Sequence, residues 1–204
     1  MAKRTKIHTY RRGFTYQKLD DRIIQRIEGK SYRADAAIPL DSLRYLRILH
    51  LDFEGITREG EMIVNHRIAV RTLKVFYCLY EMGYPIEKMR LVDEYGADDE
   101  ASMADNNTSA FNYREIAHTK QLSNHSRGLA IDINPRMNPY ITSYGIAPAN
   151  SADYEERDVV KCRGRYPDCM IHRGDAVYNV FQKYGFSWGG DWEYAKDYQH
   201  FEAL

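Results

Sequence analysis

The feature that most constrains the fold of this chain is the segment 123–135, Ser-Asn-His-Ser-Arg-Gly-Leu-Ala-Ile-Asp-Ile-Asn-Pro. It places His125 and Asp132 seven residues apart, across a glycine turn and the start of a predicted strand. A second polar cluster, Asp197-Tyr-Gln-His200, lies near the end of the chain. Two imidazoles and one carboxylate, with a second carboxylate beside them, are the minimum for a hydrolytic zinc site with an open coordination position. Such a site requires a fold that brings the C-terminal segment beside residues 123–135.

The predicted strand after the glycine turn has two different faces. Leu129, Ile131 and Ile133 point to one side and anchor the strand in the core, whereas Asp132 points to the other side. We therefore expect Asp132 to face a polar cavity, in which the small side chain of Ala130 leaves room.

The sequence offers a candidate for each role in zinc-dependent amide hydrolysis. His125, Asp132 and His200 would supply the three protein ligands of one zinc ion. Asp197 lies three residues before His200, close enough to move a proton without binding the metal. Arg114 is the best candidate for a positive group that meets an oxyanion or a substrate carboxylate.

Each of these residues also has a structural interpretation. A loop histidine can be a structural residue, Asp132 a turn-forming residue and Asp197 a surface charge. Arg114 could form an ion pair with Glu115 or with an acidic loop residue, and the pair Gly189–Gly190 could be only a turn. Five other histidines receive no role: His8, His50, His66, His118 and His172.

Helices and antiparallel strands in mixed order predict an α+β fold with a single domain, in which helices flank a central antiparallel sheet. Within the strand predicted over 43–53, Tyr45, Leu49, Leu51 and Phe53 share one parity. The expected helices cover 15–28, 67–82 and 176–184. Asn65 would cap the second helix and Asp175 the third. The apolar stripe of the second helix consists of Ile68, Thr72, Val75, Phe76 and Leu79. The other expected strands cover 60–65, 89–93, 129–134 and 200–202, and residues 94–109 and 135–174 are expected to be loops. We divide the chain into an N-terminal helical extension, 1–40, packed on a catalytic domain, 41–204.

The composition excludes some classes of function. Lys+Arg and Asp+Glu both number 29, so no net charge draws the chain toward nucleic acid or an anionic membrane. No apolar run approaches the about 20 residues of a membrane span, so no transmembrane segment is predicted. The basic start, from Lys3 to Arg12, is interpreted as a solvated tail, and no signal peptide is visible. Either the protein is not exported by that route, or the sequence begins after the cleavage site.

Three cysteines are present. Cys78 lies in an apolar helical pattern and is interpreted as a buried thiol. Cys162 and Cys169 flank a short polar loop, and they could form a disulfide in an oxidising compartment or remain reduced.

The pattern Ser123-x-His125-x-x-Gly-x-Ala-x-Asp132, followed by Asp197-x-x-His200, resembles the zinc D-alanyl-D-alanine carboxypeptidase family. That family includes the vancomycin-resistance D,D-peptidases and the phage L-alanyl-D-glutamate endolysins. The segment 102–114, which ends in Arg114, also looks like the substrate-side arginine segment of one branch. The resemblance covers about residue 40 to the end.

The resemblance implies that His125, Asp132 and His200 bind zinc and that Asp197 is the general base and then the general acid. Arg114 would polarise the scissile carbonyl or hold the substrate, and Ser123 would lie in the substrate cleft. It also implies a compact α+β fold shared with the hedgehog signalling domain. The first 40 residues and the loop 136–174 match no motif, so we expect the walls that set specificity to lie there. Aromatic candidates for these walls, each with core packing as an alternative role, are Tyr140, Tyr144, Tyr154, Trp188 and Trp192.

The leading hypothesis is a zinc metallopeptidase that hydrolyses a peptide bond next to D-amino acids in peptidoglycan stem peptides. The bond could be that of a D-Ala-D-Ala dipeptide, that of the terminal D-Ala of a stem, or L-Ala-D-Glu. One alternative is a non-catalytic zinc-containing module that binds cell wall or protein, and another is a zinc hydrolase of a different amide. The substrate implies the cell envelope, secretion or a phage lysin as the location, and the residues define no oligomeric state.

Overall fold

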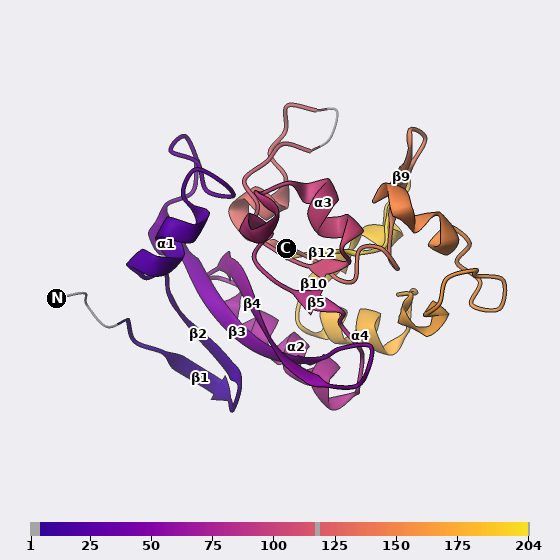
Figure 1. Cartoon of the computed structure of the whole chain (residues 1–204), viewed down its shortest axis with the longest axis horizontal. Coiled ribbons are helices and arrows are strands. Elements are labelled where there is room, and N and C mark those ends of the chain that lie inside the picture. The colour runs from indigo at the N-terminus through magenta and orange to yellow at the C-terminus, as the bar shows by residue number, and fades with distance from the viewer. Residues whose placement is uncertain (1–4, 117–118, 204) are drawn as a thin grey trace.

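The computed structural model describes residues 5–116 and 119–203, and it combines helices with mainly antiparallel strands (Figure 1). The predicted α+β class with antiparallel sheets is therefore confirmed. The strands form several sheets, however, in place of the one central sheet that was expected. Four residues considered above lie outside the described part of the chain: Lys3, Arg4, His118 and Leu204.

The largest sheet is built by the first third of the chain. Its strands β1 (His8–Arg11), β2 (Phe14–Lys18), β3 (Leu43–Leu51) and β4 (Thr57–Asn65) pair in sequence order, each antiparallel to the next. The first 40 residues therefore contribute two strands as well as a helix, so the description of this segment as purely helical needs correction.

The helix predicted over 15–28 is wrong at its beginning. Residues 15–18 belong to β2, and the helix α1 covers only Asp21–Ile27. Asp20 sets the start of α1, because its side chain accepts hydrogen bonds from the backbone N–H groups of Arg22 and Ile23. β2 pairs along its length with β3, and this long-range pairing outweighs the helical pattern of the local sequence.

The sheet is covered on both faces. Leu46 and Ile48 of β3 pack toward α2 (Ala69–Glu81), whereas Leu43 and Ile63 pack toward α1. The odd-numbered face of Tyr45, Leu49 and Leu51 that the sequence singled out is only half-buried, and Phe53 lies beyond the end of β3. A strand with two covered faces has no single apolar parity, so alternation identified the strand but not its more deeply buried side.

Helix α2 confirms the predicted apolar stripe. Its five residues are buried, and Gly83, with φ +74°, follows the end of the helix. Asn65 is not the N-cap residue, since the helix starts at Ala69 after Ile68. The Asn65 side chain instead accepts a hydrogen bond from the backbone N–H of Arg67, two residues along.

Residues 94–109 are more ordered than predicted. They include helix α3 (Asp99–Ala104), whose N-cap residue Asp98 accepts a hydrogen bond from the Ala101 N–H, and the short strand β6 (Asn107–Thr108). β6 runs parallel to β5 (Lys88–Met89), which is all that remains of the strand expected over 89–93. Because α3 is short and rich in acidic residues, its sequence had the pattern of a polar loop. The helix borders the site described below.

A second sheet is formed by segments far apart in the chain. β12 (His200–Ala203) lies between β10 (Phe186–Trp188) and β7 (Ala130–Asp132), antiparallel to both, and all three contribute to the main core with α2. Helix α4 (Ala176–Lys183) packs against this sheet, and its predicted cap Asp175 accepts a hydrogen bond from the Tyr178 N–H.

The segment 135–174, expected to be loop-rich, contains a small hairpin. β8 (Tyr140–Thr142) pairs with β9 (Gly145–Ala147) and with β11 (Lys196–Asp197). The three cysteines are free thiols. Short 3-10 helices cover Leu40–Ser42, Val92–Tyr95, Asn124–Arg127, Ala149–Tyr154, Pro167–Cys169 and Gly189–Asp191.

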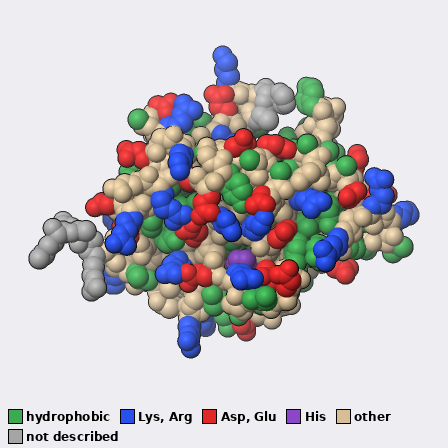
Figure 2. Space-filling model, viewed as in Figure 1, with side chains coloured by type: hydrophobic (Ala, Val, Ile, Leu, Met, Phe, Trp, Pro, Cys, Tyr) green, Lys and Arg blue, Asp and Glu red, His purple; other side chains and the backbone are tan. Residues whose placement is uncertain are grey.

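The surface fits a chain without net charge. On the face of the molecule shown in Figure 2, Lys and Arg side chains are interspersed with Asp and Glu side chains. Among the described residues, no helix is both long and apolar enough to cross a membrane.

Candidate metal centre

The pairing of β7 with β12 brings the two ends of the predicted motif together. His200, the first residue of β12, is paired directly opposite Asp132, the last residue of β7. Directly opposed residues of antiparallel strands place their side chains on the same face and close together. The sheet therefore determines that Asp132 and His200 share one site.

His125 reaches the same site from the 3-10 helix that precedes β7. Ser123 begins this turn by accepting a hydrogen bond from the His125 backbone N–H, and Gly128 ends it with φ +64°. A Cβ atom at Gly128 would lie 2.7 Å from the backbone nitrogen of Asn65 in β4. The glycine thus gives the chain both the left-handed turn and the close approach that direct His125 inward.

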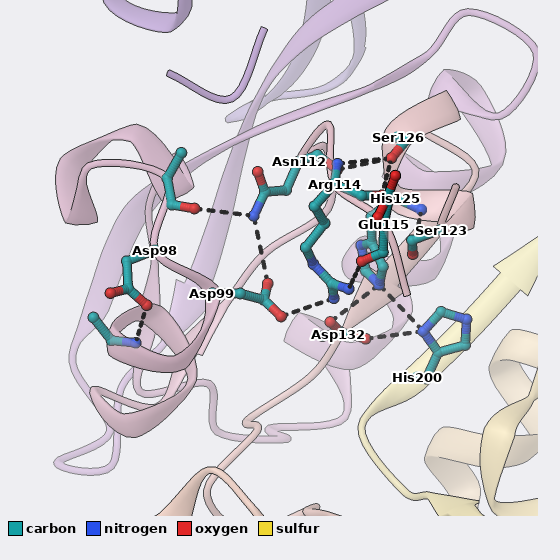
Figure 3. A network of polar contacts seen from close by, with 12 residues as sticks. Asp98, Asp99, Asn112, Arg114, Glu115, Ser123, His125, Ser126, Asp132 and His200 are labelled. Atoms are coloured by element: carbon teal, nitrogen blue, oxygen red, sulfur yellow. Dashed lines mark hydrogen bonds and ion pairs between the residues drawn. The ribbon is translucent and has the colours of Figure 1, made fainter. Parts of the chain in front are cut away.

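The three side chains form a compact buried cluster (Figure 3). His125 Nε2 lies 3.1 Å from Asp132 Oδ2, His200 Nδ1 lies 3.2 Å from Asp132 Oδ1, and the two histidine nitrogens are 3.2 Å apart. A tetrahedral zinc ion with bonds of about 2.1 Å would hold its ligand atoms roughly 3.4 Å apart. Two imidazole nitrogens, each close to one oxygen of the same carboxylate, fit a zinc-type ion in number, chemistry and spacing.

The outer nitrogen of each histidine is also held. His125 Nδ1 is 2.5 Å from the carbonyl oxygen of Ala110, so it carries a proton, and Nε2 is the nitrogen available to a metal ion. His200 Nε2 is 3.2 Å from Oε2 of Glu202, a residue for which the sequence predicted no role. The spacing of two residues along a strand, which puts Glu202 on the same face as His200, was the available signal.

The charges of the cluster stabilise one another. Burial raises the pKa of Asp132, but the charge and hydrogen bonds of His125 and His200 outweigh it and hold this pKa far below its usual value. Burial lowers the pKa of His200, but hydrogen bonds to Asp132 and Glu202 outweigh it and raise the pKa to about 10. A proton on His200 thus occupies the place that a metal cation would take.

Asp197 lies beside the cluster without belonging to it. It ends β11, and its Oδ1 atom is buried without a hydrogen-bond partner among the described residues. Burial, with the charge of Asp132 as a further contribution, raises the pKa of Asp197 to about 7, a value suited to a general base near neutral pH. A Cβ atom at Gly189 would lie 2.8 Å from the Asp197 Cβ and 3.2 Å from the His200 Cβ, so glycine leaves the space that both residues occupy.

Arg114 approaches from a different part of the chain. Its guanidinium forms an ion pair with Asp99, the first residue of α3, at 2.8 Å, while its buried Nε atom has no partner among the described residues (Figure 3). An ion pair with an acidic residue was one of the alternatives considered for Arg114. The backbone N–H of Arg114 donates a hydrogen bond of 2.8 Å to Ser126 Oγ, which connects the segment around Arg114 to the turn that carries His125.

The three cluster residues, Asp197 and Arg114 all line one cleft of about 850 Å³. Trp192 lines it with its ring centroid 5.2 Å from that of His200, and Tyr140 lines it from β8. Ser123 also borders the cleft, but its hydroxyl oxygen is engaged in capping the 3-10 turn. The other aromatic candidates do not line this cleft: Tyr154 and Trp188 are buried in the core, and Tyr144 is exposed.

A second cavity, of about 800 Å³, contains none of the predicted metal-binding or catalytic residues, although the wall candidate Tyr154 lines it. It mixes acidic and basic side chains, several of which already form ion pairs, such as Asp52 with Arg58. We therefore assign the candidate site to the cleft that holds the buried His-Asp-His cluster. Four of the histidines without a role make local contacts elsewhere, with Tyr16 (His8), Ile86 (His50), Ser42 (His66) and Arg157 (His172).

Fold and cluster together define a compact α+β protein with a candidate metal site of the hydrolytic type. A family model described as D-alanyl-D-alanine carboxypeptidase matches residues 117–203. The match confirms the resemblance predicted from the motif and supports the zinc D-alanyl-D-alanine carboxypeptidase family for this chain. It spans less than half of the chain, including His125, Asp132, Asp197 and His200 but not Arg114. Neither the search of curated proteins nor that of solved structures gave a significant match.

Proposed function

We propose that this protein is a zinc metallopeptidase that hydrolyses a peptide bond next to a D-amino acid in peptidoglycan stem peptides. The observation that carries the proposal is the buried cluster of His125, Asp132 and His200 beside Asp197, within the segment that matches the carboxypeptidase family. The cleft around it, about 850 Å³, has room for a short peptide.

His125 and His200 would hold one zinc ion per chain through Nε2 and Nδ1, and Asp132 would hold it through its carboxylate. When bound, such an ion supplies a Lewis acid and lowers the pKa of a coordinated water toward about 7. The network of hydrogen bonds behind the histidines keeps their donor atoms oriented before any ion binds.

Asp197 would take the proton of the attacking water and later deliver it to the leaving amine. Its burial and its Oδ1 atom suit this exchange, because that oxygen has no hydrogen bond to another described residue that must be broken first. Arg114 would stabilise the negative charge that develops on the carbonyl oxygen, or hold a substrate carboxylate. Either role requires the guanidinium to share its contact with Asp99 or to exchange it for the substrate.

Trp192 and Ser123 stay predictions as substrate-binding residues, supported by their positions on the wall of the cleft. The hedgehog-like arrangement inferred from the resemblance also stays a prediction. Because the proposed substrate is cell-wall peptide, we propose that the protein acts in the cell envelope, after secretion or as a phage lysin.

The test is mass spectrometry of purified muropeptides after incubation with zinc-loaded protein, with and without a chelator. We expect a mass loss that the chelator abolishes, since the cluster is the proposed source of reactivity. Loss of one alanine identifies a D,D-carboxypeptidase, and release of D-Ala-D-Ala a dipeptidase. Cleavage after L-Ala identifies an L-Ala-D-Glu endopeptidase.

An absence of cleavage by zinc-loaded protein would contradict the proposal. Binding of the same muropeptides without turnover would then favour the non-catalytic module. The ion pair between Arg114 and Asp99 is the observation that supports this alternative, because it occupies the guanidinium. Chelator-sensitive cleavage of other amides, with muropeptides left intact, would favour a zinc hydrolase outside the cell wall.

A further inference from the structure

Glu202 lies behind His200, on the side away from the other two cluster residues. The two nitrogens of an imidazole are on separate edges of the ring, and Figure 3 shows the Nδ1 edge of His200 turned toward Asp132 and His125. The Glu202 carboxylate, 3.2 Å from Nε2, is therefore on the opposite edge. Glu202 is not one of the donor residues of the buried cluster: Asp132 faces the proposed metal position, whereas Glu202 contacts the outer nitrogen of His200.

This contact determines which nitrogen of His200 is free. An ionised carboxylate only accepts hydrogen bonds, so the imidazole must donate its Nε2–H to Glu202. Without a metal, Nδ1 also donates to Asp132 Oδ1, which is 3.2 Å away. When a cation takes the place of that proton, the Nε2–H stays on Glu202 and the Nδ1 lone pair points at the cluster. His125 has the opposite arrangement, because the Ala110 carbonyl holds its Nδ1–H and leaves Nε2 free.

Glu202 is itself held by a residue of the first motif. Asn124 Nδ2 donates a hydrogen bond of 2.6 Å to the same Oε2 atom, and Asn124 immediately precedes His125 in the 3-10 turn. The Glu202 side chain is 23% exposed, so without this contact it would have freedom to rotate away from the ring. The contact links the turn that carries His125 to the strand that carries His200.

We propose that Glu202 is a positioning residue for the metal site: it fixes His200 as an Nδ1 ligand, and Asn124 fixes Glu202. The inference rests on the proposed metal site and adds to it a carboxylate–histidine pair that raises the basicity of one ligand. A carboxylate in this position typically changes metal affinity by about 10–100-fold. The neutral Ala110 carbonyl behind His125 has no such charge, so the two histidines differ in strength as ligands.

The first measurement is zinc affinity by competition with a chromophoric chelator, without substrate. We expect Glu202→Ala to weaken binding by about 10–100-fold. Glu202→Gln should give a smaller loss, because its amide oxygen still accepts the Nε2–H without a charge. Asn124→Ala should weaken binding less than Glu202→Ala, and should add nothing in the double variant, since both act through one contact. The matched control is Glu193→Gln, an exposed glutamate near the cleft, which should bind zinc like the wild type.

The second measurement separates positioning from a merely structural role. Long-range ¹H–¹⁵N correlation spectra of the zinc-loaded wild-type protein should show His200 protonated at Nε2 and metal-bound at Nδ1. Melting curves of the metal-free variants check that lost affinity does not come from lost folding. Because Glu202→Gln preserves shape, it remains informative if Glu202→Ala does not fold.

In the zinc-loaded protein, a proton on Nδ1 of His200 would overturn the inference. Equal zinc affinity for Glu202→Gln, Glu202→Ala and wild type would overturn it too. A wild-type protein that binds no zinc would overturn both this inference and the proposed function. Tight zinc binding that depends on Glu202, in a protein that cleaves no muropeptide, would support the inference and contradict only the proposed peptidase.

Discussion

The two sides of the cleft are built in different ways. The cluster side is fully buried, and direct cross-strand pairing of His200 with Asp132 determines its geometry. The arginine side rests on irregular chain and on one ion pair between side chains that are 29% and 26% exposed, Arg114 and Asp99. Rigid pairing suits atoms that must meet one ion at fixed distances, whereas a partly exposed ion pair can exchange partners with a substrate.

The family match follows the same division. It includes the strands and turns of the cluster side but begins only after α3 and Arg114 in the chain. The comparison therefore predicts that changes at the three donor residues of the cluster abolish metal binding and chemistry together, whereas changes on the arginine side alter catalysis and leave the metal in place.

The largest effect is expected at the cluster. His200→Ala removes one of three donors and the cross-strand contact, so both zinc binding and muropeptide cleavage should fall below detection. Zinc content and activity of the purified variant check this, with His66→Ala, an exposed histidine, as the control that should retain both. A zinc-free but active His200→Ala would break the assignment of the whole cluster side.

Asp197→Asn should retain zinc and lose about 10²–10⁴-fold in kcat, because the amide cannot accept the proton.

Asp197 must be ionised to act as a base, so wild-type kcat/KM should rise with pH as Asp197 loses its proton. Its pKa of about 7 sets the upper limit for that midpoint, since a bound cation favours the charged form. The variant should lack this limb of the pH profile. The control is Asp168→Asn, at an exposed position, and full activity of Asp197→Asn would exclude the assigned role.

On the arginine side, Arg114→Ala should lower kcat by about 10²–10³-fold, as for loss of one oxyanion donor, with zinc affinity unchanged. Asp99→Asn should have a much smaller effect, about two- to fivefold, in line with the 0.2–1 kcal/mol typical of exposed ion pairs. Steady-state kinetics and zinc titration on the same preparations test both. Loss of zinc in Arg114→Ala would show that the two sides are not independent.

The last expected effect needs no substitution: zinc affinity should change with pH. Burial lowers and hydrogen bonding more strongly raises the pKa of metal-free His200, to about 10, so at neutral pH zinc must displace a proton. Apparent affinity should therefore rise with pH, by about tenfold per unit below that pKa. Calorimetry in buffers of different ionisation enthalpy counts the proton released. Binding without proton release would mean that His200 is already neutral.

The sequence was informative where local chemistry and order along the chain are enough. The glycine turn, the alternation around Asp132 and the spacing of Asp197 and His200 identified the residues that the structure brings into one cleft. The capped helix after Asp175 and the apolar stripe of α2 were also predicted, because caps and periodicity are local.

Prediction was wrong where long-range pairing overrides local pattern. Residues 15–18 became a strand because β3 offers a partner, and the half-buried parity of β3 was misleading because helices cover both faces of the sheet. Helix α3 was missed because six residues give too little periodicity to recognise.

The sequence by itself therefore determined which groups are available: two imidazoles, two carboxylates, a guanidinium and the glycine that turns the chain between them. Only the tertiary structure decided how these groups are held. The register of β7 and β12 places His200 opposite Asp132. Packing likewise decided the contacts of Ala110 and Glu202 behind the two histidines, and the pairing of Arg114 with Asp99. Distances of 3.1–3.2 Å between such groups come from packing and hydrogen bonding of the whole domain, which no local pattern specifies.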